Sequence, residues 1–169
     1  MANLRTARLI LRPLRPEDAP ALTCGIGDWE VMKWLTSPPW PYGLADAEWF
    51  LNDPMSAQTF GVESGGELAG AVGLHPHKHS DGIELGYWLA RRFHGRGLMT
   101  EAARAVVADH FARGGEDLVS GYLAHNVASC NVLTKLGFRP TEVIMRHSNP
   151  IGYAVPLQRM ALTAEDFRG

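Results

Sequence analysis

The stretch from Ile83 to Thr100 constrains the fold more than any other part of the chain. Residues 83–89 follow a glycine turn and are rich in apolar side chains, which predicts a β-strand. Residues 98–113 contain no glycine or proline and are followed by two glycines, which predicts a long helix. The loop between them is rich in arginine and glycine. This unit predicts a sheet with at least one crossover helix.

Other segments extend the pattern along the chain. Further strands are predicted over residues 8–14, 58–63, 67–74, 118–124, 138–145 and 153–162. Further helices are predicted over residues 16–25, 28–35, 45–53 and 126–136. Runs of strands interrupted by single helices are typical of a mixed α/β sheet and not of a doubly wound one. The 169 residues fit one domain, and no linker or repeat divides residues 1–169.

Composition excludes several classes of protein. Hydrophobic residues make up 46% of the chain and charged residues 20%, as in ordinary globular domains. No run approaches about 18 consecutive apolar residues, so we predict no transmembrane helix and no membrane partner. The first residues lack the basic and apolar pattern of a secretory signal, so we expect a cytoplasmic protein.

The sequence also predicts no metal site. Two cysteines cannot supply a four-thiolate zinc site. His75, His77 and His79 alternate in the way that metal ligands sometimes do. Three ligands from so short a hairpin, with no cysteine nearby, nevertheless make a poor zinc site.

Charge is divided unevenly along the chain. Residues 1–16 carry four arginines and no acidic residue, whereas residues 17–90 hold eleven acidic residues against two lysines. Residues 91–113 are again basic. The net charge of −2 argues against a nucleic-acid-binding protein, which needs a strongly basic face. The contrast favours an anionic ligand at one place and a cationic one at another, with ordinary solvated surface as the alternative.

The loop before the predicted long helix has the composition of an anion-binding site. The exposed N–H groups and the dipole of a helix N-terminus attract anions. Gly95 and Gly97 allow the backbone to fold into a nest, and three arginines add positive charge. Phosphate binding is therefore favoured over a plain connection. The Walker sequence is absent, and Thr100 replaces the third glycine of GxGxxG, which leaves a dinucleotide-binding oxidoreductase as a remote alternative.

Two segments resemble the acyl-CoA motifs of the GNAT acyltransferase superfamily. Arg92-Phe-His-Gly95-Arg-Gly97 is similar to its Q/R-x-x-G-x-G/A motif. Asn126-Val-Ala-Ser129, followed by Val-Leu-Thr-Lys-Leu-Gly-Phe138, resembles its second CoA motif. The opening TARLILRPLRPEDA and the strand ELGYWL resemble the RimJ/RimL-like branch, whose named members acetylate ribosomal-protein N-termini.

The resemblance covers residues from about 6 to 167 and implies a fold and a co-substrate. The expected fold is a single-domain GNAT fold over residues 1–169, with a mixed, mostly antiparallel sheet split into a V and helices on both faces. The V would open between the strand at 83–89 and the strand at 118–124. Acetyl-CoA is the implied co-substrate and would enter there.

The two motifs and the strand before the first of them imply a set of CoA contacts. The set comprises Trp88, Leu89, Ala90, Arg91, Arg92, His94, Gly95, Arg96, Gly97, Leu98, Met99, Thr100, Asn126 and Lys135. Asn126 has the alternative role of a helix N-cap alone, and Lys135 that of a solvated helix lysine. Gly86, a glycine inside a strand, suits a close approach of pantetheine to the main chain.

Glu84 is the predicted catalytic base. An alkyl ammonium has a pKa near 10 and must lose a proton before its nitrogen can attack a thioester. Glu84 is an acid inside an apolar strand, at the place where GNAT enzymes often carry one. A purely structural, salt-bridged glutamate is the alternative.

Ser129 is the second predicted catalytic residue. Many GNAT enzymes place a tyrosine acid four residues before the glycine of the second motif, but this chain has Leu133 there. Ser129 lies one helical turn earlier on the same face, where the RimJ/RimL-like branch often has a serine. It resembles a proton donor to the leaving sulfur, with local backbone hydrogen bonds as the alternative role.

The acceptor side is predicted around residues 26–56. Trp29, Trp34 and Trp40, with Glu84, are the predicted acceptor residues, and satellite core packing is the alternative for the tryptophans. The acidic block favours a cationic amine: a protein or peptide N-terminus, a polyamine or an aminoglycoside-like molecule. A homodimer is left open.

The predicted function is transfer of an acetyl group from acetyl-CoA to such an amine by an N-acetyltransferase. A catalytically silent acyl-CoA-binding sensor is the rival. A sensor would keep Arg92–Gly97 and lose the base, so the presence of Glu84 argues against it.

Overall fold

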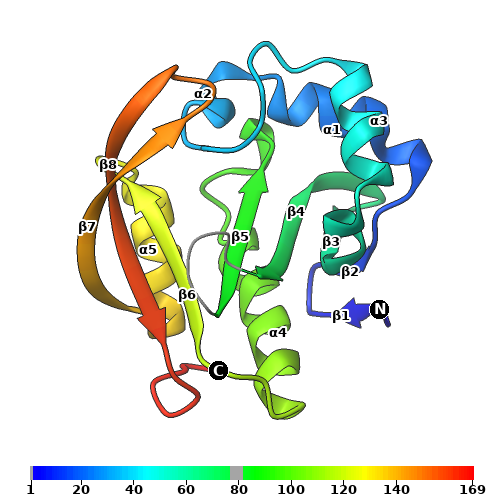
Figure 1. The fold of residues 1–169 in the computed structure, drawn as a ribbon. Helices are drawn as coiled ribbons and strands as arrows, with labels where there is room; N and C mark the ends of the chain where they lie inside the picture. The colour runs from blue at the N-terminus through cyan, green and yellow to red at the C-terminus, as the bar shows by residue number, and fades with distance from the viewer. Residues whose placement is uncertain (1, 77–81) are drawn as a thin grey trace.

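A computed structural model describes residues 2–76 and 82–169 of the chain (Figure 1). In that part, one sheet has the strand order β1-β2-β3-β4-β5-β6-β8-β7. The strands are β1 (Leu4–Arg5), β2 (Ile10–Pro13), β3 (Thr59–Ser64), β4 (Glu67–Pro76), β5 (Ile83–Leu89), β6 (Leu118–Leu123), β7 (Arg139–Ser148) and β8 (Tyr153–Leu162). The helices are α1 (Ala19–Ile26), α2 (Trp29–Met32), α3 (Leu44–Asn52), α4 (Leu98–Ala112) and α5 (Val127–Leu136). Short 3-10 turns are η1 (Pro16–Asp18), η2 (Pro54–Gln58) and η3 (Arg91–Phe93).

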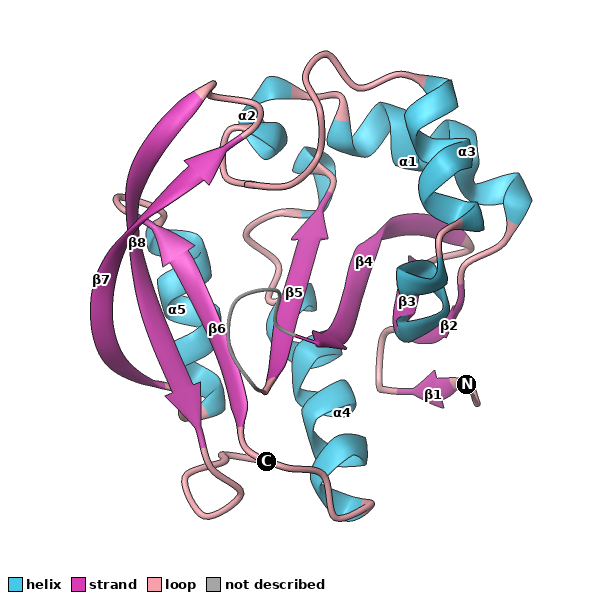
Figure 2. Ribbon diagram, in the orientation of Figure 1, coloured by secondary structure: helices cyan, strands magenta, loops and turns pink. Residues whose placement is uncertain are grey.

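The sheet splits between β5 and β6. These two strands run parallel, whereas the other neighbouring strands run antiparallel. Their pairing is limited to Ile83 with Leu118 and Glu84 with Val119. Beyond this point β5 stays paired with β4 and β6 stays paired with β8, so the two strands diverge toward the top of Figure 2. The predicted mixed, mostly antiparallel and V-shaped sheet is confirmed.

Helices cover both faces of this sheet. On one face α4 and α5 pack on each other, with α4 against β4 and β5 and α5 against β6. Leu85 and Leu89 of β5 join the main core there. On the other face α1 packs on β4 and α3. The Trp88 ring lies so close to α1 that a Cβ added at Gly25 would be 2.6 Å from its Cζ3 atom, so glycine is needed at that position.

Local sequence signals place the ends of α5 as predicted. Asn126 caps the helix, because its Oδ1 accepts the Ser129 N–H at 3.1 Å. Gly137 ends it in the left-handed conformation, with φ of 103°. The Phe138 N–H then donates to the Leu133 carbonyl at 3.1 Å, as in a Schellman motif. The Asn and Gly signals confirm the predicted ends of α5.

One predicted helix is shorter than expected. The sequence predicts a helix over 28–35, but α2 is limited to Trp29–Met32. The next two backbone bonds, from Trp34 to Val31 and from Leu35 to Met32, join residues three apart. The chain therefore tightens into 3-10-type turns as it leaves α2.

A buried ion pair joins β2 to the start of α1. The Arg12 guanidinium donates to both carboxylate oxygens of Asp18, at 2.8 and 2.9 Å, and to Glu63 of β3 at 2.9 Å. The side chains of Arg12 and Asp18 are each 9% exposed. Burial raises the pKa of Asp18, but its hydrogen bonds with Arg12 and with the Arg15 N–H outweigh burial and hold that pKa below its ordinary value.

We predict that Asp18→Ala lowers the free energy of unfolding by about 3 kcal/mol, because it leaves the buried Arg12 with Glu63 as its remaining carboxylate. Denaturant unfolding at neutral pH measures this loss. Asp109→Ala, which breaks the exposed ion pair with Arg113, is the control and should cost less than about 0.5 kcal/mol. Equal losses in the two variants would contradict the assignment.

The same pair has a defined pH dependence. Because folding lowers the pKa of Asp18, its stabilising contribution is present above the ordinary pKa of 3.8 and is lost as pH falls through the folded-state pKa. Acid should therefore destabilise the wild type more than it destabilises Asp18→Ala. Unfolding curves between about pH 2 and pH 7 test this, and parallel stability profiles for the two proteins would refute it.

Candidate active site

The diverging strands enclose a cleft of about 670 Å³. Its lining includes residues 84–89 of β5 and residues 120–123 of β6, together with the start of α4, one side of α5 and the segment that follows α2. At the fork, the Ser120 hydroxyl donates to the Leu85 carbonyl at 2.9 Å. A side chain thus takes over the interstrand bond at the point where the two backbones separate.

The start of α4 forms the nest that the sequence predicts. Gly95 and Gly97 both have φ of 72°, and Gly97 is the N-cap residue of α4. A Cβ at Gly95 would meet nothing within 4 Å, so the left-handed backbone, and not lack of space, favours glycine there. Leu98, Met99 and Thr100, the first turn of the helix, line the cleft. Their N–H groups and the helix dipole make this end of the cleft suitable for an anion.

Most of the predicted CoA contacts lie in the cleft. Those in its lining are Trp88, Leu89, Arg91, His94, Gly95, Gly97, Leu98, Met99, Thr100, Asn126 and Lys135. His94 also closes the loop on itself, because its Nε2–H donates to the Leu89 carbonyl at 2.8 Å.

Three of the predicted contacts lie outside the lining of the cleft. Ala90 is buried at 6% exposure, and its N–H donates to a β4 carbonyl. The Arg92 guanidinium donates to Glu67 at 2.8 Å, away from the cleft. The Arg96 guanidinium lies over the Phe93 ring, 6.0 Å from its centroid. The motif gives the positions of these arginines but not the direction in which their side chains turn.

Ser129 meets an unpredicted partner across the V. The hydroxyl of Tyr87, on β5, lies 2.8 Å from Ser129 Oγ on α5 and 3.3 Å from the Ser129 carbonyl oxygen. The period of two along β5 sets Tyr87 on the opposite face from Gly86 and Trp88, where a core residue is expected. The missed signal is chemical, because a buried tyrosine hydroxyl usually needs a hydrogen-bond partner.

Tyr87 stays protonated at neutral pH. Burial raises its pKa above the ordinary value of 10.0, and the smaller opposing effect of the hydrogen bond with Ser129 does not cancel this. A protonated phenol has one O–H to donate. When that O–H is directed to Ser129 Oγ, the serine keeps its own proton for a group in the cleft.

Glu84 is half-buried and lines the narrow end of the cleft. It occupies the last β5–β6 pair, opposite Val119, and is paired with His75 of β4 on its other side. Burial lowers the pKa of His75, so this neighbour carries no positive charge at neutral pH. Leu133, at the position where many GNAT enzymes carry tyrosine, is fully buried in the core. Leu133 therefore offers the cleft no hydroxyl group.

Of the three tryptophans predicted as acceptor residues, Trp34 is the one in the lining of the cleft. Trp34 lines the cleft, with the Lys33 ammonium 5.4 Å from its ring centroid and Glu30 paired with that ammonium. Trp29 and Trp40 instead pack on each other, with their centroids 4.9 Å apart. They are 40% and 42% exposed and do not belong to the lining of the cleft.

The segment after α2 is fixed across the end of the cleft. The buried Ser148 hydroxyl donates to the Leu35 carbonyl at 3.1 Å. Asn149 donates through its backbone to Thr36 at 2.9 Å and through its side chain to Ser37 at 2.7 Å. The end of β7 and the turn that follows it therefore hold residues 35–37 in place. Figure 1 shows α2 and this hairpin as neighbours.

Among residues 2–76 and 82–169, no group of three or more His, Cys, Asp or Glu side chains is placed to hold a metal ion. His77 and His79, considered above as zinc ligands, lie outside the described residues. Within the same two ranges, no helix has both the length and the apolar character needed to cross a bilayer.

Comparison with known families identifies the class of protein. Residues 8–139 match the family model described as an acetyltransferase (GNAT) domain. The chain therefore belongs to the GNAT acetyltransferase family, as the two motifs predict. Acetyl-CoA is the acetyl donor of this family, and it is bound in the solved structure of the microcin C7 self-immunity acetyltransferase MccE, which also contains AMP.

Individual relatives agree with this placement. YdaF of Bacillus subtilis (strain 168), whose name assigns it provisionally to the ribosomal N-acetyltransferases, is 28% identical. That match covers 61% of this chain and 62% of YdaF, which is less than two thirds of its length.

Solved structures share the fold over nearly the whole chain. A GNAT-family acetyltransferase from Bacillus anthracis is 24% identical, with a TM-score of 0.84 over 97% of this chain and 99% of its own. RimL, a ribosomal L7/L12 α-N-protein acetyltransferase solved with CoA, is 18% identical, with a TM-score of 0.80 over 96% and 98%. MccE is 17% identical, with a TM-score of 0.79 over 94% and 93%. These likenesses confirm the predicted GNAT fold.

We predict that Gly97→Glu weakens acetyl-CoA binding by more than about 100-fold, because it adds bulk and negative charge beside the α4 N-terminus. Gly114→Glu is the control, because Gly114 also has positive φ but lies in open space beyond the far end of α4. Calorimetry on both folded variants checks this. Wild-type affinity in Gly97→Glu would show that the anion binds elsewhere.

Proposed function

We propose that this chain transfers the acetyl group of acetyl-CoA to a primary amine by direct attack, without a covalent enzyme intermediate. One observation carries the proposal: a single cleft contains an anion-binding nest at the start of α4 and the side chains of Glu84 and Ser129. A protein that only stores or senses acyl-CoA has no need of an acid and a hydroxyl beside the thioester. Positioning the thioester and the amine together accounts for most of the rate enhancement in such a reaction.

The donor would lie along the edge of β5. Its pyrophosphate would accept hydrogen bonds from the N–H groups that follow Gly95 and Gly97, with positive charge from Arg91. The pantetheine amides would pair with the β5 main chain beyond the fork, near Gly86, while Asn126 and Lys135 would contact the donor from α5. An N–H near Trp88 or Leu89 would then polarise the thioester carbonyl.

The reaction removes two protons from the nitrogen and delivers one proton to the sulfur. The substrate ammonium first gives a proton to Glu84, directly or through one water, and the free amine nitrogen attacks the thioester carbon. As the nitrogen–carbon bond forms, the carbon–sulfur bond breaks and its electron pair goes to sulfur. The nitrogen loses its second proton as the amide forms. That proton passes through water to Ser129, which donates its own proton to the sulfur. The products are the N-acetylated amine and CoA with a free thiol.

The acceptor that we favour is the N-terminus of a protein or peptide. Glu84 lines the cleft and suits an ammonium group, and Trp34 lines it and suits an apolar side chain of the same acceptor. The names of YdaF and RimL support a ribosomal-protein acceptor. Polyamines and aminoglycoside-like amines are the alternative acceptors. A cytoplasmic location, which such acceptors require, remains a prediction.

An acceptor panel tests the proposed function. Thiol release from acetyl-CoA is followed with a peptide bearing a free N-terminus, the same peptide with a blocked N-terminus, spermidine and an aminoglycoside. We expect release with the free peptide, and mass spectrometry should locate the acetyl group on its α-amine. Release with spermidine or the aminoglycoside alone would replace the acceptor. Acetyl-CoA binding without transfer to any amine would favour the silent sensor.

We predict that Glu84→Gln lowers kcat/KM by about 100-fold or more at neutral pH, because glutamine keeps the size of the side chain but cannot accept the ammonium proton. Raising the pH should partly restore the rate, since more of the amine is then free without a base. Glu142→Gln, an exposed change on β7, is the control. A loss confined to KM, with kcat and its pH profile unchanged, would make Glu84 a substrate contact only.

We predict that Ser129→Ala lowers kcat by about 10-fold to 100-fold, because the departing thiolate then lacks its proton donor. Tyr87→Phe should lower kcat by about 10-fold, because the Ser129 proton is no longer directed into the cleft. The double variant should be no slower than Ser129→Ala, since both changes interrupt one hydrogen-bonded unit. Single-turnover kinetics measure these rates. Multiplying effects in the double variant would show that the two hydroxyls act separately.

A further inference from the structure

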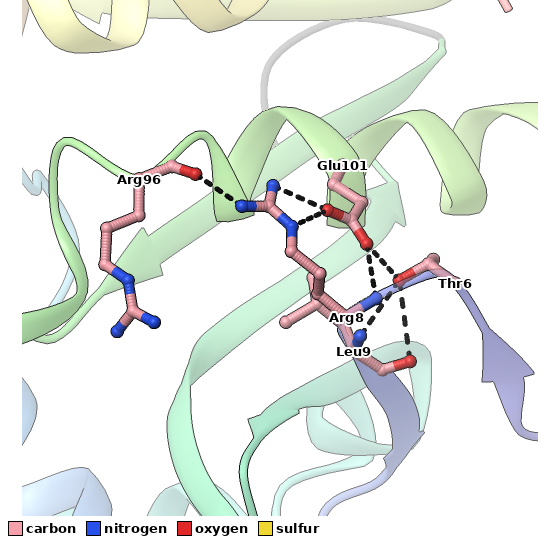
Figure 3. Close-up of polar contacts among 5 residues, drawn as sticks. All are labelled: Thr6, Arg8, Leu9, Arg96 and Glu101. Atoms are coloured by element: carbon pink, nitrogen blue, oxygen red, sulfur yellow. Dashed lines mark hydrogen bonds and ion pairs between the residues drawn. The ribbon is translucent and has the colours of Figure 1, made fainter.

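The N-terminal segment is fastened to the nest at the start of α4. Arg8, which precedes β2, donates from Nη1 to the Arg96 carbonyl at 2.8 Å and from Nε to Glu101 Oε2 at 2.7 Å. The Arg8 backbone N–H and the Thr6 hydroxyl both donate to Glu101 Oε1, at 2.9 and 2.5 Å. Figure 3 shows Arg8 between the Arg96 carbonyl and the Glu101 carboxylate, with Thr6 on the far side of that carboxylate. Residues about 90 positions apart thus form one polar cluster.

The bond to Arg96 fixes the orientation of one peptide group. The Arg96 carbonyl and the Gly97 N–H belong to the same trans peptide plane and therefore point in opposite directions. Because the Arg96 carbonyl points toward Arg8, the Gly97 N–H points away from Arg8. A glycine at φ of 72° offers little resistance to a flip of this peptide. Such a flip would present a carbonyl oxygen where an anion needs a donor.

Arg8 also compensates an acid near the nest. Glu101 lies in the first turn of α4, and its side chain is 19% exposed. Burial raises the pKa of Glu101, but its hydrogen bonds with Thr6 and Arg8 outweigh burial and keep that pKa below its ordinary value. The carboxylate is therefore charged at neutral pH, and without a cation beside it would repel a bound phosphate.

We propose that Arg8 is a positioning residue for acetyl-CoA: it fixes the Arg96–Gly97 peptide and neutralises Glu101, so that the nest is formed before the donor binds. The inference rests on the proposed function, because it assigns the pyrophosphate of acetyl-CoA to this nest. The role needs the planar fork of arginine, whose parallel N–H groups reach a carboxylate and a carbonyl at once. Arg8 does not line the cleft, so it acts through the loop and not as a phosphate ligand.

Calorimetry with acetyl-CoA and steady-state kinetics test this. Arg8→Ala should weaken binding and raise the KM for acetyl-CoA by about 10-fold, while kcat at saturation stays within about twofold, because the reacting thioester lies elsewhere in the cleft. Arg113→Ala is the control: it removes an arginine of the same charge from the far end of α4. It should change neither value. If kcat falls in Arg8→Ala while its KM is unchanged, the role is only structural and the proposal fails.

A second variant separates the geometry of the Arg8 guanidinium from its positive charge. Arg8→Lys keeps the positive charge, so an electrostatic role alone would restore wild-type affinity and overturn the proposal. We expect its affinity to lie between those of the wild type and Arg8→Ala, because lysine keeps the charge beside Glu101 but cannot bind the Arg96 carbonyl at the same time. In both variants, and without ligand, hydrogen exchange of the amides at residues 97–100 should be faster than in the wild type.

If the wild type itself does not bind acetyl-CoA, the proposed function fails. Binding by the wild type and equal binding by Arg8→Ala would refute the positioning role alone.

Discussion

The early separation of β5 from β6 is the constraint on which the rest of the site depends. Each strand keeps one neighbour, β4 or β8, so the two halves of the sheet stay stable while their inner edges part. Backbone N–H and C=O groups along those edges need partners. Ser120 satisfies the Leu85 carbonyl at the fork, and Tyr87 meets Ser129 further along. A ligand that carries its own amides, such as pantetheine, is suited to the remaining edge of β5.

The two ends of the cleft differ in charge, which gives a bound donor one direction. The start of α4 offers main-chain N–H groups, a helix dipole and Arg91, all favourable to phosphate. The proposed acceptor side offers Glu84, which favours a cation, whereas Glu30 and Trp34 already contact the Lys33 ammonium. A donor anchored by its phosphates at the first place would extend its thioester toward the second. The geometry of the split sheet thus links the binding of an anion to the chemistry of an amine.

The elements and their ends follow from local signals that a single sequence carries. Helix α4 follows from a run without glycine that ends before Gly114, and α5 follows from its caps Asn126 and Gly137. Strand β5 follows from its apolar residues. These signals are local, which is why the three elements agree with the predictions. The contacts between Tyr87 and Ser129 and between Arg8 and Glu101 join residues 42 and 93 positions apart, and no local pattern encodes them. The direction in which a side chain points likewise cannot be predicted from local sequence. Arg92 turns to Glu67, and Trp29 packs on Trp40, because of neighbours that the fold alone brings close.

The most direct test of the account is a crystal structure of the chain with acetyl-CoA. The account predicts pantetheine between β5 and β6 with its amides on the β5 main chain. It also predicts the pyrophosphate at the N–H groups of residues 97–100 and the thioester carbonyl near the N–H groups of Trp88 and Leu89. Acetyl-CoA bound with its phosphates elsewhere, for example in the depression between Cys24 and Arg92, would contradict it.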